Sequence, residues 1–193
     1  IRDTLGGLSL DTVNVIGHSL GGRVILDCLR NGFGFKSACI VDIGLRPLNN
    51  TTVIKYIDAM ARVEREQLTG RPEIEARLME LGVPDQAMAR FLMTNLVKEA
   101  DGHFTFKLLY LDALRKQLLK PDKIEPFNRV LDSMPCLLVK GTRSEYVNAE
   151  DIQDYKRIFP KLEICELDAG HNVHADQPDL FVEAYSQFVL SSV

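Results

Sequence analysis

The sequence predicts an α/β fold in which helices flank a parallel sheet that is interrupted by a helical insertion. Two patterns support this fold class. Short apolar, β-branched runs alternate with stretches of helical periodicity, and several helical stretches follow one another between 46 and 131. The chain has 193 residues, 46% hydrophobic and 26% charged, which is ordinary for a globular protein. We expect a core formed by 1–45 and 132–193 and a helical lid formed by 46–131.

The first part of the chain predicts the end of a helix, followed by a strand, a helix and a second strand. Ile1–Leu10 is typical of a helix that precedes a strand, and Thr12–Ile16 is a short β-branched run. Asn31-Gly32 ends the next helix, and Ala38–Val41 forms a second buried strand. The helix between the strands is indicated by apolar residues at Leu20, Val24, Ile25, Cys28 and Leu29.

The insertion contains four stretches with helical spacing. Thr51–Thr69 carries a regular apolar face, and Pro72–Leu81 and Pro84–Val97 each have proline near the start, where a helix tolerates it. Leu108–Lys120 is the fourth candidate. A helical insertion at one end of a sheet is suited to act as a lid. Its larger apolar residues either line an acyl site or form the lid core, namely Met60, Met88, Phe91, Met93 and Phe106.

The last part of the chain predicts two more strand–helix units. The strands are Cys136–Val139 and Glu163–Leu167. The helices that follow have apolar faces formed by Ile152, Tyr155, Ile158 and Phe159, and by Leu180, Phe181, Ala184, Tyr185, Phe188 and Val189. Strands that alternate with helices imply a parallel sheet covered on both faces.

A serine lies at the turn between the first strand and its helix. Gly17, His18, Ser19, Leu20 and Gly21 fit the pattern G-x-S-x-G, in which a sharp turn lifts the serine above the sheet. We expect the two glycines to let neighbouring segments pass closely, and the Leu20 N–H to stabilise an oxyanion. The motif indicates a nucleophile elbow of the α/β-hydrolase fold; the alternative is a glycine-rich turn without catalysis.

A serine hydroxyl needs a base that removes its proton. The histidines are His18, His103, His171 and His174. His171 follows the last strand, at the edge of the sheet where the elbow lies, and its place in the chain after the serine suits this fold. We therefore predict His171 as the base, with a solvated loop histidine as the alternative, and expect His18 to pack in the elbow.

A metal site is the competing interpretation of the histidine loop. His171 and His174, with Asp168 or Asp176, resemble a ligand set, but a third well-spaced histidine or cysteine is missing. We therefore predict no metal.

Two positions could supply the acid that orients the histidine. Asp42 directly follows an apolar strand, where a charge is costly without a partner. The second position is the loop after the third strand, where Ser144 stands at the expected place and Glu145 and Asp151 are nearby. Asn148 followed by Asp151 is typical of a helix cap. We favour Asp42, with Glu145 as the alternative.

Several segments together resemble the α/β-hydrolase domain-containing protein 11 subfamily and related bacterial esterases. They are Gly17–Gly22, Val41–Ile43, Leu92–Val97, Gly102–Leu114 and Gly170–Asp176. The resemblance implies that Asp42 is the acid, that the substrate is a small-molecule acyl ester or lipid-like ester, and that no cofactor is needed. It also implies mitochondrial residence. The alternative is a cytoplasmic location, because buried free thiols fit a reducing compartment.

The chain departs from this family in two ways. After Val41–Ile43 it continues Gly44-Leu45-Arg46-Pro47, so the lid entrance differs. We also expect the strands that precede the elbow strand, and the loop with a second oxyanion donor, to be missing. A non-catalytic, truncated form that binds a partner is therefore the alternative to a serine esterase.

Charge and hydropathy exclude two classes of partner. The formal net charge of −4 argues against non-specific nucleic-acid binding, which needs a basic face. No apolar run approaches the roughly 18 residues of a membrane span. Nothing in the sequence indicates an oligomeric state.

Overall fold

The computed structural model describes residues 2–7, 13–47, 51–107, 115, 116, 118, 119 and 127–191. The chain forms two compact units. The first consists of Ile1–Arg46 and Ile124–Val193, and the second of Pro47–Lys123.

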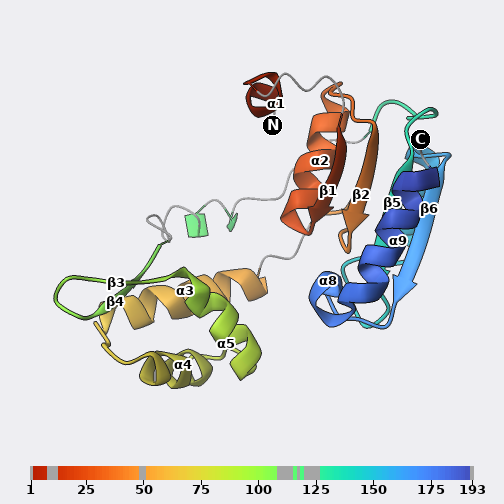
Figure 1. Ribbon diagram of the computed structural model, residues 1–193. Coiled ribbons are helices and arrows are strands. Elements are labelled where there is room, and N and C mark those ends of the chain that lie inside the picture. The colour runs from red at the N-terminus through yellow and green to blue at the C-terminus, as the bar shows by residue number, and fades with distance from the viewer. Residues whose placement is uncertain are drawn as a thin grey trace. The chain divides into compact units, whose positions relative to one another are not determined.

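The first unit is built on a parallel four-stranded sheet (Figure 1). Its order is β1 (Asn14–His18), β2 (Ser37–Val41), β5 (Cys136–Gly141) and β6 (Leu162–Leu167). Every residue of β2 is buried, as expected for a central strand of small and β-branched residues. The predicted α/β fold class is thereby confirmed.

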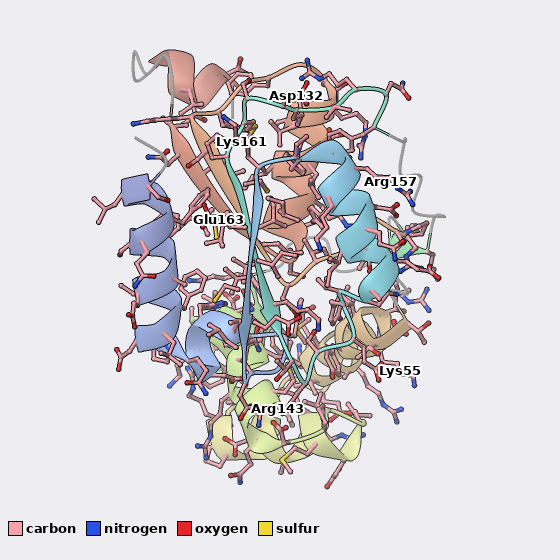
Figure 2. The ribbon with its side chains drawn as sticks, turned by 90° about the vertical axis from the view of Figure 1, so that its right-hand side faces the viewer. Lys55, Asp132, Arg143, Arg157, Lys161 and Glu163 are labelled. Atoms are coloured by element: carbon pink, nitrogen blue, oxygen red, sulfur yellow. The ribbon has the colours of Figure 1, made fainter. Side chains whose placement is uncertain are left out.

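Helices cover both faces of this sheet. They are α2 (Leu20–Arg30), α7 (Ala149–Ile158), α8 (Val173–Asp176) and α9 (Pro178–Ser191). The unit also contains a short helix before β1, α1 (Arg2–Gly7). Figure 2, which views the sheet edge-on, shows α9 on one face and α2 and α7 on the other. Because side chains alternate along a strand, Cys39 and Val41 share a core with Phe188 of α9.

The two edges of the sheet carry different loops. Figure 2 shows Asp132 and Lys161 near the edge where β5 and β6 begin, and Arg143 at the opposite edge, where these strands end. Parallel strands place the loops that follow them at one common edge, which is where ligands bind in open α/β sheets.

The start of α7 confirms the predicted helix cap. Asn148 accepts hydrogen bonds from backbone N–H groups of the first turn, and the Asp151 carboxylate accepts one from the Asn148 N–H. Asp151 is 4% exposed and also accepts bonds from the Leu45 N–H and the Arg46 guanidinium, both at 3.2 Å. This carboxylate therefore fixes the chain after β2 as well as the helix.

The second unit is mainly helical. Its elements are α3 (Thr51–Arg65), α4 (Arg71–Glu80), α5 (Gln86–Leu92), the 3₁₀ turn η1 (Met93–Asn95), β3 (Leu96–Lys98) and β4 (Phe104–Phe106). Its core includes Met60, Met93 and Phe106, while Met88 packs partly against it and Phe91 is 62% exposed. Within this unit, three of the five candidate acyl-lining residues are therefore core residues.

The prediction of one helix over Pro84–Val97 is wrong. The helix α5 ends at Leu92, and the chain turns through η1 into β3, which pairs in antiparallel fashion with β4. The Lys107 N–H donates to the Asn95 carbonyl at 2.7 Å. Pairing with the next strand of the chain thus overrides the helical spacing. The helix predicted over Leu108–Lys120 lies mostly outside the described residues.

Among the described residues, no helix combines the length and the apolar character needed to cross a membrane.

Candidate active site

Ser19 lies at the junction of β1 and α2 in an unusual backbone conformation. Its φ of 52° and ψ of −116° fall outside the regions that residues with a side chain ordinarily occupy. The Ser19 N–H donates to the carbonyl of Val41 at the end of β2, at 3.0 Å. The neighbouring strand therefore fixes the strained turn that presents the hydroxyl.

The glycines of this turn differ in what they accommodate. A Cβ atom on Gly17 would lie 2.5 Å from the backbone of Gly21, and one on Gly22 would lie 2.7 Å from Ile43 Cγ2. A Cβ atom on Gly21 would meet nothing within 4 Å. The expectation that Gly21 must lack a side chain for neighbouring segments to pass closely is therefore wrong, because the space that its side chain would fill is open. Gly17 and Gly22 have this role.

The side chain of His171 connects the serine to a carboxylate. His171 lies in the loop between β6 and α8, and its Nε2 is 2.9 Å from Ser19 Oγ. Its Nδ1 is 2.8 Å from Asp42 Oδ2. Because an ionised carboxylate only accepts hydrogen bonds, Nδ1 carries the proton, which leaves Nε2 free to accept the serine proton.

Asp42 is a fully buried carboxylate with three partners. It directly follows β2 with a φ of 48° and is 0% exposed. Oδ1 accepts a bond from the Gly141 N–H at 3.1 Å, and Oδ2 accepts one from the Ser144 hydroxyl in addition to His171. These bonds offset the cost of burying the charge. The structure thus brings Asp42 to His171, while Glu145 is exposed to solvent.

His18 forms a further contact with His171. Its Nε2–H donates to the His171 carbonyl at 2.8 Å, and its ring centroid lies 4.6 Å from that of His171 and 4.8 Å from that of His174. Burial lowers the pKa of His18, the hydrogen bond to the carbonyl opposes this, and the neighbouring histidines lower it further. His18 therefore favours the neutral form, which supports the backbone of the His171 loop.

Two residues of the loop after β5 have little local signature. Ser144 stands where an acid is expected, yet it donates to Asp42. The Tyr146 ring stacks on the His171 ring, with centroids 3.8 Å apart and an angle of 19° between the planes. A tight turn before a helix cap is their only local signal, and it does not indicate which atoms they contact.

The backbone donor predicted to stabilise an oxyanion can be placed in the structure. Leu20 is the first residue of α2, so its N–H is among the donors that have no partner within the helix. Within the described part of the chain, no group of three or more histidine, cysteine, aspartate or glutamate side chains could hold a metal ion.

Comparison with known proteins identifies the family. A model of the alpha/beta hydrolase family matches residues 1–184. The chain therefore belongs to the alpha/beta hydrolase family.

Individual relatives are similar over most of this chain. The sn-1-specific diacylglycerol lipase ABHD11 of Mus musculus is 32% identical, over 98% of this chain and 62% of the relative. The protein of the same name from Danio rerio is 28% identical, over 96% and 59%. A solved structure described as a marine microorganism esterase is 27% identical with a TM-score of 0.82, over 97% of this chain and 74% of its own. The predicted resemblance is confirmed, and the chain spans about 60% of these curated relatives.

Proposed function

We propose that the protein is a serine hydrolase that cleaves carboxylic esters of acyl or lipid-like substrates through an acyl-serine intermediate. The observation that carries the proposal is the position of the His171 imidazole, with Nε2 2.9 Å from Ser19 Oγ and Nδ1 2.8 Å from Asp42 Oδ2. Both distances are within hydrogen-bonding range, so the side chains have the geometry of a nucleophile, a base and an orienting acid.

The proposed reaction proceeds in two halves. Ser19 Oγ attacks the ester carbonyl carbon as Nε2 of His171 takes the hydroxyl proton, and Asp42 stabilises the resulting imidazolium. The Leu20 N–H donates to the oxyanion of the tetrahedral intermediate. His171 then protonates the departing alcohol, which leaves an acyl-serine. In the second half, water attacks this ester, His171 accepts a water proton and returns it to Ser19, and the carboxylic acid departs.

The substrate class is inferred from the relatives. The mouse and zebrafish relatives carry the name diacylglycerol lipase, and the similar solved structure is described as an esterase. These names favour ester substrates with acyl chains, and the acyl-serine chemistry needs no cofactor. Mitochondrial residence rests on the resemblance alone and stays a prediction.

The alternative is a non-catalytic module that binds a partner. A site that had lost its chemistry would have no need to retain a strained serine and a buried carboxylate, both of which are costly. Ser19 keeps its positive φ, and Asp42 is 0% exposed. We therefore favour the enzyme.

Covalent labelling tests the nucleophile. A fluorophosphonate probe should label the full-length protein, and Ser19→Ala should abolish both labelling and the hydrolysis of a short-chain aryl ester. Ser186→Ala, which removes an exposed serine on α9, is the matched control and should label like the wild type. Equal labelling of the Ser19→Ala protein would refute the assignment.

A further inference from the structure

Tyr146 covers one face of the imidazole that the proposed mechanism uses. It belongs to the loop between β5 and α7, and its ring lies nearly parallel to that of His171, with centroids 3.8 Å apart. The two hydrogen bonds of His171, to Ser19 and Asp42, involve its ring nitrogens, which leaves the ring faces to other contacts. The tyrosine ring occupies one of these faces.

The backbone on both sides of Tyr146 is fixed. Val147 is 2% exposed, and the next residue, Asn148, caps α7. On the other side, the Tyr146 N–H donates to Ser144 Oγ at 3.3 Å, and the Ser144 hydroxyl donates to Asp42. Tyr146 is therefore not a free surface side chain, although its exposed fraction is 36%. The same short loop supports both the acid and the base.

The stacked ring has two physical consequences for the imidazole. It restricts tilting of the ring about its bonds to Ser19 and Asp42, which keeps Nε2 aligned with the hydroxyl. Its π face also attracts a cation. Because His171 becomes a cation only when it takes the serine proton, this attraction appears as the reaction proceeds. An interaction that strengthens as the transition state forms raises turnover more than it affects binding.

We propose that Tyr146 is a positioning residue for this reaction, which holds His171 in the plane of proton transfer and stabilises its charged form. The inference rests on the proposed function. It does not require that Tyr146 contact the substrate or that its hydroxyl take part, since the stack is formed by the ring.

The surrounding charges are the same in every Tyr146 variant. The charged and titratable groups around His171 and its loop include Asp42, His18, His174, Arg143, Asp168 and Asp176. Comparison of variants at position 146 therefore isolates the contribution of the aromatic face.

Three substitutions separate the aromatic face from side-chain volume. Tyr146→Phe keeps the ring, Tyr146→Leu keeps apolar bulk without a π face, and Tyr146→Ala removes both. In the full-length protein, with a short-chain aryl ester, we expect Tyr146→Phe to keep kcat within about twofold. We expect the leucine and alanine variants to lower kcat by about three- to thirtyfold with little change in KM. Thermal unfolding of each variant checks that the fold is retained.

A spectroscopic measurement detects the stack without turnover. In the protein labelled with ¹³C-histidine, the ring protons of His171, assigned with His171→Gln, should be shielded by the tyrosine ring current. The shielding should persist in Tyr146→Phe and vanish in Tyr146→Leu. A leucine variant with wild-type kcat, or a rise in KM at unchanged kcat, would overturn the positioning role. Unchanged His171 resonances in Tyr146→Leu would overturn the stack itself.

The two proposals fail in different ways. If Ser19 is not the nucleophile, the Ser19→Ala protein still reacts with the fluorophosphonate, and the ring-current shift at His171 remains. If only the role of Tyr146 is wrong, labelling depends on Ser19 while the leucine variant turns over like the wild type.

Discussion

Nδ1 of His171 lies 2.8 Å from Oδ2 of Asp42, although 129 positions of sequence separate the two residues. Asp42 follows β2 and His171 follows β6, and β5 lies between these strands in the sheet. The Gly141 N–H, at the end of β5, donates to the other oxygen of Asp42 at 3.1 Å. The Asp42–His171 pair therefore spans the carboxyl edge of the sheet, and the middle strand supports it.

The first prediction concerns the choice of acid. Asp42→Asn should lower kcat of the full-length protein by about ten-thousand-fold, because an amide no longer holds the imidazole in the tautomer with the proton on Nδ1. Glu145→Gln, in an exposed position, should stay within about twofold of the wild type. Steady-state kinetics with an aryl ester measures both. A small loss for Asp42→Asn together with a large loss for Glu145→Gln would reverse the assignment.

The second prediction compares two glycines of the elbow. Gly17→Ala should destabilise the protein by about 3 kcal/mol, because the added Cβ atom would lie 2.5 Å from backbone atoms that cannot move independently. Gly21→Ala should leave stability unchanged or slightly raised, since its Cβ atom meets no neighbour and alanine favours a helix. Thermal and urea unfolding of the two variants provide the comparison. Equal losses would contradict the packing described for the turn.

The third prediction concerns stability in acid. Burial lowers the pKa of His18 below its ordinary value of 6.5, so the unfolded chain binds more protons than the folded chain in the window just below that value. Stability should therefore fall as the pH drops through this window. His18→Gln stays neutral and retains an N–H donor for the His171 carbonyl.

Melting temperatures between about pH 8 and pH 5 test the His18 prediction. The variant should lose less stability on acidification than the wild type, because it has no imidazole that must stay neutral in the folded state. Parallel curves for the two proteins would show that His18 does not contribute to the pH dependence.

Features with a local signature follow from the order of the residues alone. The strands and most helices follow from hydrophobic period, and Ser19 follows from a five-residue pattern at a strand–helix junction. The sequence favours Asp42 as the acid because a carboxylate directly after an apolar strand needs a partner. Each inference depends on neighbours within a few positions.

Which distant groups meet depends on how the chain folds in space. The Ser144 bond to Asp42, the Tyr146 stack on His171 and the His18 bond to the His171 carbonyl all join segments that are far apart in the sequence. The β3–β4 hairpin, which ends the expected helix early, is a shorter-range pairing that helical spacing does not reveal. Hydrogen-bond partners and ring contacts are set by how the strand ends converge in space, and that convergence leaves no periodic trace along the chain.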